Sequence, residues 1–188
     1  ATVALGQAVP RVFVLDAKIL QERRKAVLDP KTAAQYARPI KRLTSDADKA
    51  MKVEIAPVTS KTATPPSGDK HDYMSQAPYF WKNPDTKTGF PYIRRDGERN
   101  PEILQYPDHT LMDDMVKTVE TLSIAYYFTG KEEYAARAAT ILRMWFLDAK
   151  TKMNPNLEYA QAIPGLNTGR GIGIIETHGL IRVVDAIG

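Results

Sequence analysis

Eight of the thirteen prolines lie between Pro57 and Pro107, and this concentration constrains the fold more than any other feature. Because proline fixes φ and has no N–H to donate, long helices and central strands are not expected there. The same segment carries seven of the sixteen aromatic residues, which argues against disorder, since aromatic side chains gain from burial. Two interpretations remain open: the wall of a binding cleft, or a loop that only covers a core.

Helical patterns flank this segment. Residues 13–28 and 31–52 have the pattern of two amphipathic helices, and Pro39 predicts a kink or break within the second. On the other side, Thr110 and Asp113 have the spacing of a capping box, and apolar residues then recur every three or four positions. These apolar residues are Leu111, Met115, Val119, Leu122 and Tyr126.

A second helix is expected directly after this one. Gly130 predicts the end of the first helix, and a helical pattern resumes over residues 131–148. Its apolar face consists of Tyr134, Ala138, Ile141 and Trp145. So short a connection predicts an antiparallel helical hairpin.

The stretch from Asn154 to Gly188 begins with a glycine-rich loop. Asn167, Thr168 and Arg170 lie within its glycine run, so an amide, a hydroxyl and a guanidinium form a donor-rich patch suited to a carboxylate or a phosphate. The glycine spacing is not that of a dinucleotide-binding loop, and no Gly-Lys-Ser/Thr follows. An anion site and an ordinary loop closing onto a helix both remain open.

The loop leads into a helical pattern in which Ile174, His178 and Ile181 share one side. A histidine on an apolar face is more often a core residue than a functional one. Its position just after the donor-rich loop nevertheless makes His178 a candidate for a direct role.

The helices pair in sequence and no clear strand is present, so an all-α fold of stacked helical hairpins, such as a toroid, is expected. Its length suits a single domain with three parts: residues 1–56, 57–109 and 110–188. Fewer helices are expected than a closed toroid needs. We therefore expect an incomplete (α/α) toroid, the N-terminal portion of a larger fold whose missing part would cover apolar residues of the last helix. These residues are Ile175, Val183, Val184 and Ile187.

Composition excludes several classes of function. The net charge of +4 is mild and its lysines and arginines are dispersed, which argues against nucleic-acid binding. The absence of cysteine excludes thiolate metal sites and a cysteine nucleophile, and we expect neither a metal nor a cofactor. No apolar run is long enough to span a membrane. The lack of cysteine is compatible with either the cytoplasm or an exported compartment, and a start at Ala1 without methionine is typical of a processed or trimmed chain. A periplasmic or secreted location is expected.

Four blocks of sequence, in order, resemble the alginate lyase superfamily of polysaccharide lyases. The similarity is closest to the branch that acts on alginate or glucuronan. The blocks span residues 71–102, 106–115, 127–146 and 153–177. The resemblance implies an incomplete (α/α) toroid that binds an anionic polyuronate and cleaves it by β-elimination.

The resemblance also implies roles for single residues. Asn167 is expected to neutralise the substrate carboxylate, with Arg170 beside it. His178 is a further catalytic candidate because of its position just after the donor-rich loop. An Asn-Asn-His block and a catalytic tyrosine, which are expected further downstream, are not in this chain. The alternative is a non-catalytic carbohydrate-binding or structural helical module.

Six residues of the proline-rich segment are candidates for substrate binding. Aromatic faces stack on sugar rings, whereas arginine and histidine bind charged substituents. The candidates are His71, Tyr73, Trp81, Tyr92, Arg94 and Arg95. We expect them to face the same cleft as the glycine-rich loop.

Overall fold

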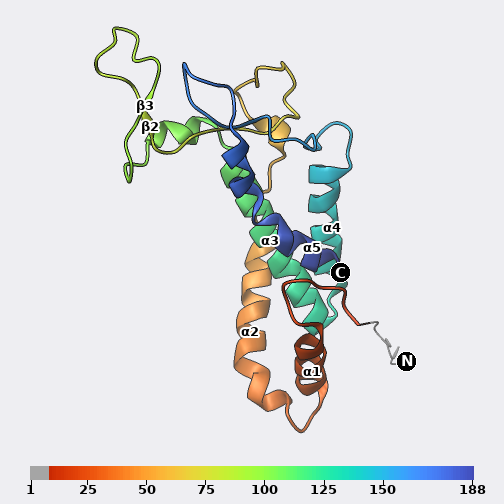
Figure 1. Ribbon diagram of the computed structural model, residues 1–188. Coiled ribbons are helices and arrows are strands. Elements are labelled where there is room, and N and C mark those ends of the chain that lie inside the picture. The colour runs from red at the N-terminus through yellow and green to blue at the C-terminus, as the bar shows by residue number, and fades with distance from the viewer. Residues whose placement is uncertain (1–8) are drawn as a thin grey trace. The chain divides into compact units, whose positions relative to one another are not determined.

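The computed structural model describes residues 9–188, which are mostly helical (Figure 1). These residues form two compact units. Unit 1 comprises residues up to Glu54, Val116–Thr140 and Gly179–Gly188, and unit 2 comprises Ile55–Met115 and Ile141–His178. Because both units contain non-contiguous segments, their limits do not coincide with the predicted parts 1–56, 57–109 and 110–188, and the single domain stays a prediction.

The N-terminal helices of unit 1 follow the predicted pattern with later starts. Helix α1 spans Ala17–Leu28, and α2 spans Ala33–Ala50 with Pro39 inside it. The Asp16 side chain caps α1 by accepting from the backbone N–H groups of Lys18 and Ile19. Residues 13–15 precede the helix because their N–H groups donate to the Asp185 carboxylate.

Helices α3 (Asp108–Thr129) and α4 (Glu132–Phe146) carry the predicted apolar faces. Helix α3 begins two residues before Thr110, so the predicted capping box is wrong. Gly130 has a φ of 71° and separates the two helices, as predicted. On α4, all four predicted face residues are buried: Tyr134, Ala138, Ile141 and Trp145.

The C-terminal segment does not continue as one helix from the glycine-rich loop. A 3₁₀ segment, η3, covers Gly171–Thr177, and α5 begins only at Leu180 and runs to Ile187. Ile174 lies in η3 and Ile181 in α5, so the predicted common side of one helix, which includes His178, is not formed. All three side chains are exposed and do not pack on a core. Of the residues expected to be open, Ile175, Val184 and Ile187 are exposed, whereas Val183 is buried.

Unit 2 contains four short strands that the sequence analysis did not predict. They are β1 (Met74–Gln76), β2 (Phe80–Trp81), β3 (Ile93–Arg94) and β4 (Tyr159–Ala162). Strands β1 and β4 are parallel, with a register shift between Met74 and Gln76, and β2 and β3 are antiparallel. Strands of two to four residues are too short to show the alternation that identifies a strand in sequence.

Two further 3₁₀ segments, η1 (Val58–Ser60) and η2 (Pro101–Gln105), complete unit 2. A buried ion pair ties η1 to the start of α3: Lys61 Nζ lies 2.9 Å from the Asp108 carboxylate, and neither side chain is exposed. Lys61 Nζ also donates to the carbonyls of Val58 and Lys70, and the Met74 N–H donates to Asp108. The pair therefore fixes the position of strand β1. No helix of residues 9–188 is long and apolar enough to cross a membrane.

Candidate functional site

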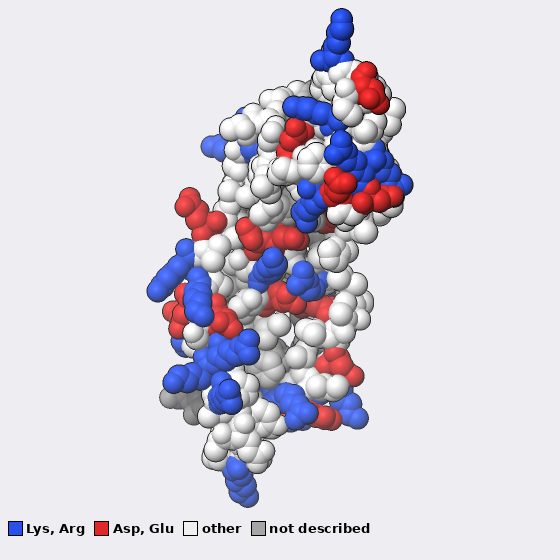
Figure 2. All heavy atoms as spheres, turned by 90° about the vertical axis from the view of Figure 1, so that its left-hand side faces the viewer, with Lys and Arg blue, Asp and Glu red and all other residues white. Residues whose placement is uncertain are grey.

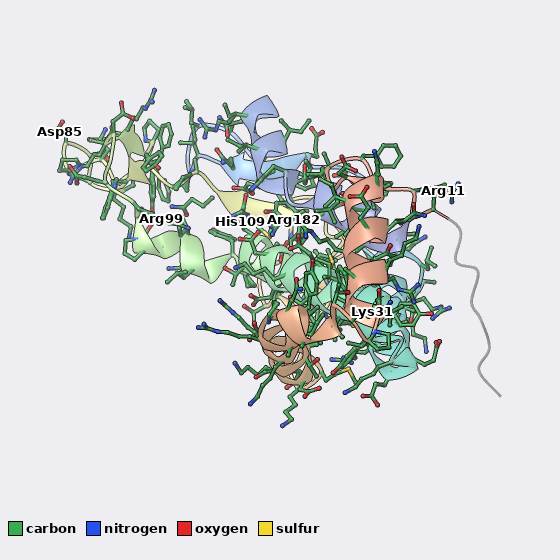
Figure 3. All side chains as sticks on the ribbon, turned by 90° about the horizontal axis from the view of Figure 1, so that it is seen from below. Arg11, Lys31, Asp85, Arg99, His109 and Arg182 are labelled. Atoms are coloured by element: carbon green, nitrogen blue, oxygen red, sulfur yellow. The ribbon has the colours of Figure 1, made fainter. Side chains whose placement is uncertain are left out.

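A cleft of about 240 Å³ opens on unit 2, and strands β1 and β4, segments η2 and η3 and the first turn of α3 contribute to its wall. Its polar lining residues are Ser75, Gln76, Arg99, His109, Thr110, Gln161, Glu176 and His178, and Tyr79 and Tyr106 add aromatic surface. Arg99 lies beside η2 and His109 near the start of α3 (Figure 3). The volume of this cleft is slightly below the range of about 300–1,000 Å³ that is typical of small-molecule sites.

A buried carboxylate organises one wall of the cleft. Glu176 Oε2 accepts hydrogen bonds from the hydroxyl groups of Tyr73 and Ser75, both over 2.6 Å. The Ser75 hydroxyl oxygen in turn accepts from the Gln161 N–H over 2.8 Å. Burial, followed by the charge and hydrogen bond of Glu176, raises the pKa of Tyr73. The network thus joins β1, β4 and η3, and it holds Tyr73 protonated.

Gln161 on β4 is fixed by Arg170. The guanidinium donates from Nη2 to the Gln161 side-chain Oε1 over 2.6 Å and from Nε to its backbone carbonyl over 3.1 Å. Gln161 has a φ of 52°, a left-handed value found at no other non-glycine residue among residues 9–188. Such a conformation costs on the order of 1 kcal/mol and persists only where its surroundings hold it.

Two buried polar atoms on the cleft wall have no partner. Gln76 is 5% exposed, and its Nε2 has no acceptor among residues 9–188. His109 Nδ1 is also unpaired within the same residues. A buried donor without a partner costs about 1–3 kcal/mol, so unpaired groups beside a cleft indicate a polar ligand.

The glycine run owes its glycines to close packing against β4. A Cβ atom at Gly169 would collide with the Glu158 carbonyl, and one at Gly173 would lie 2.5 Å from the Ala160 side chain. At Gly171, in contrast, there is open space. Packing therefore accounts for two of these glycines without a bound phosphate.

The predicted catalytic residues lie in three different settings. His178 lines the cleft, and its Nδ1 lies 2.9 Å from the Ile175 carbonyl. Asn167 is exposed, with its Oδ1 accepting from the Ile163 N–H, and does not line the cleft. Arg170 is half-buried over the Phe80 ring, and burial followed by the charge of Arg94 lowers its pKa. A direct role of Arg170 on substrate is disfavoured, because Gln161 already occupies two of its donors.

Two predicted substrate-binding residues have structural contacts instead. Tyr73 has no exposed surface, so it cannot stack on a sugar ring and supports Glu176 from beneath the cleft. Tyr92 is buried and donates to Glu102, and burial together with that carboxylate raises the pKa of Tyr92 to about 12.

The other aromatic and basic candidates on β2 and β3 form local pairs. Arg95 lies over the Trp81 ring at 5.7 Å, and Arg94 forms an exposed ion pair with Asp96. Lys and Arg atoms are interspersed with Asp and Glu atoms over this segment, at the top of Figure 2. Asp85 lies at the far end of the loop between the two strands (Figure 3). These residues do not line the cleft.

His71 is also outside the cleft, where its Nδ1 lies 2.6 Å from the Lys152 carbonyl. The proline-rich segment and the glycine-rich loop do meet, since the Tyr92 N–H donates to the Pro164 carbonyl over 3.0 Å. The two segments therefore touch, but of the predicted site residues only His178 lines the cleft. Within residues 9–188, no group of three or more His, Asp or Glu side chains could hold a metal ion.

Several cleft residues lie within the four resembling blocks without a signal of their own, among them Gln76, Arg99, Tyr106, His109, Gln161 and Glu176. Glutamine carries no charge and forms no periodic pattern, so neither amide has a local signal. His109 lies one residue before Thr110, in a stretch whose spacing predicts a helix cap, so no separate signal marks this histidine.

The fold agrees with comparisons to known proteins. The family model described as alginate lyase matches residues 57–188, and the chain belongs to that family. Among solved structures, an alginate lyase from Bacteroides ovatus is 46% identical in sequence, with a TM-score of 0.86. The similarity covers 95% of this chain and 46% of that protein, so the chain spans less than half of the length of its relative. Curated proteins gave no significant match. The resemblance and the mostly helical fold predicted from sequence are confirmed.

Proposed function

We propose that this chain is part of a polysaccharide lyase that cleaves a uronic-acid polymer, alginate or glucuronan, by β-elimination. The observation that carries the proposal is the cleft of unit 2. It combines the unpaired Gln76 and His109 nitrogens with Arg99 and His178 in a family of alginate lyases. Donors of this kind suit an oxygen-rich, negatively charged sugar.

β-Elimination requires three groups from the protein: a base, an acid and hydrogen-bond donors that stabilise the intermediate. A base removes the C5 proton, the C4–O bond breaks as the C4=C5 double bond forms, and an acid protonates the leaving oxygen. The intermediate carries negative charge on its carboxylate, so hydrogen-bond donors must stabilise it. In this chain, Arg99 at the cleft is proposed as such a donor, whereas Asn167 lies outside the cleft and its role stays a prediction.

Proton transfer needs side chains that can accept and donate a proton at the reacting atoms. His109 and His178, which both line the cleft, are the candidates within this chain. The expected Asn-Asn-His block and tyrosine would add further groups. Because a polymeric polyuronate does not cross membranes, a periplasmic or secreted location is part of the proposal.

Ultraviolet absorbance tests the reaction directly. The purified protein is mixed with alginate, with glucuronan and with a neutral polysaccharide, and formation of the unsaturated uronate is followed over time. We expect a rise in absorbance with at least one polyuronate and none with the neutral polymer. Binding of polyuronate without any rise would instead support the non-catalytic carbohydrate-binding alternative.

A further inference from the structure

We propose that Gln76 and Gln161 form an amide pair that binds the carboxylate of one uronate unit, and that Arg170 is a positioning residue acting through Gln161. This inference rests on the proposed function, because a uronate is the ligand that it names. It assigns substrate contact to two uncharged residues and removes it from the guanidinium.

The two amides lie on paired strands and line the same cleft. Gln76 ends β1, and its register partner on β4 is Ala162, the neighbour of Gln161. Both glutamines line the cleft, and both are more than nine-tenths buried. The pairing of β1 with β4 changes register between Met74 and Gln76, directly beside this amide. Local irregularities of this kind re-aim side chains and are frequent beside active sites.

Hydrogen bonding determines which end of each amide is available. Gln161 Oε1 accepts from Arg170, so its Nε2 is the remaining group, and no residue of 9–188 accepts from it. Gln76 Nε2 is likewise unpaired within the described residues. Each amide therefore has an N–H group without an acceptor among the described residues, and the natural partner of such a group is an acceptor oxygen.

A carboxylate fits this arrangement better than a cation or an apolar group. It presents two acceptor oxygens and no donor, which complements amide nitrogens. The two donors also need a fixed direction, which explains why Gln161 adopts its left-handed backbone and why Arg170 holds it at two points.

Gln76→Met gives the sharpest test, because methionine matches the shape of glutamine and removes an unpaired donor. We expect the ligand-free protein to melt at the same or a higher temperature, while its dissociation constant for alginate or glucuronan oligosaccharides rises at least about tenfold. A purely structural role for Gln76 would lower the melting temperature and leave binding unchanged, which would overturn the inference.

Gln161→Glu tests the second amide, since its carboxylate can still accept from Arg170 but presents an oxygen to the substrate. We expect binding of the polyuronate to fall at least about tenfold and binding of the carboxyl-reduced, neutral polymer to be unaffected. Equal losses for both polymers would show that the amide recognises a hydroxyl group and would overturn the carboxylate assignment.

A double-mutant cycle tests the positioning role of Arg170. Arg170→Met alone should weaken binding, but in the Gln161→Ala background it should weaken binding no further. Additive losses would mean that Arg170 contacts the substrate itself. Circular dichroism of each variant verifies that the fold is retained.

The wild-type protein separates this inference from the proposed function. Polyuronate binding without unsaturated product would defeat the lyase proposal and leave the amide pair standing. Cleavage by the wild type, together with unchanged binding by Gln76→Met and Gln161→Glu, would defeat the amide pair alone. Failure of the wild type to bind any polyuronate would overturn both.

Discussion

Arg170 donates two hydrogen bonds to Gln161, one to the Gln161 side-chain oxygen over 2.6 Å and one to the Gln161 backbone carbonyl over 3.1 Å. This contact changes the meaning of the most conspicuous basic residue in the glycine-rich loop. In this role the guanidinium fixes the position of Gln161 and does not itself present its charge to a ligand in the cleft. The residue that it presents, Gln161, is the one with a strained backbone.

Tyr73→Phe should lower stability without affecting substrate binding. Its hydroxyl donates to the buried Glu176 carboxylate, and loss of a hydrogen bond to a charged group costs about 1.5–3 kcal/mol. Because Tyr73 has no exposed surface, the Michaelis constant for polyuronate in the proposed lyase reaction should stay the same. Urea unfolding and steady-state kinetics provide the two measurements, and a raised Michaelis constant would restore the predicted substrate-binding role.

Lys61→Met should destabilise the protein by about 3–5 kcal/mol, because the Asp108 carboxylate would remain buried without a counter-charge. Burial raises the pKa of Asp108 and lowers the pKa of Lys61, so both groups are held in a costly environment. Adding Asp108→Asn to Lys61→Met should recover part of the loss. If the double variant were less stable than the single one, the unpaired charge would not be the cause.

Gly173→Ala should be strongly destabilising, since its Cβ would lie 2.5 Å from Ala160. Overpacking of this kind typically costs about 1–3 kcal/mol. Gly171→Ala is the matched control two residues away, where open space predicts no loss or a gain of about 0.4–1 kcal/mol. Thermal melting compares the two variants, and similar effects at both positions would contradict the packing argument.

Asp185→Asn should destabilise unit 1 by about 1–3 kcal/mol at neutral pH, because the Asp185 carboxylate accepts from three N–H groups of residues 13–15. Burial raises its pKa, but the three N–H donors outweigh burial and lower it overall.

A lowered folded-state pKa means that the stabilisation is present above the unfolded value of about 3.9 and is lost as pH falls through the folded value. The difference in unfolding free energy between wild type and Asp185→Asn should therefore shrink in acid. Asp46→Asn, at an exposed ion pair, is the control and should change stability by less than about 1 kcal/mol at any pH. A difference that stays constant from neutral pH to about pH 2 would contradict the role of the charge.

Helices were predictable from sequence because apolar residues repeat along them, and Trp145 and Ile141 are buried as that repeat requires. The start of α3 was not predictable from sequence. Asp108, its first residue, forms an ion pair with Lys61, nearly fifty residues earlier, and such a contact leaves no local pattern.

The cleft shows the same limit. Residue types indicated aromatic and basic side chains, yet Tyr73 is buried and Arg94 is paired with Asp96. Nothing in the sequence marks Gln76, because its unpaired Nε2 is a consequence of how the chain packs. Which donors are free is a property of the packed structure, whereas sequence shows only which donors exist.

The parallel pairing of β1 with β4 has a consequence for how this protein is made. Met74 must wait for Tyr159 to leave the ribosome, which takes roughly 4–17 s at about 5–20 residues per second. Until then the backbone of β1 is an open edge, available to any other extended chain. A nascent chain that stalled before residue 159 would expose that edge indefinitely, so the vulnerable interval in the biogenesis of the cleft is set by translation speed.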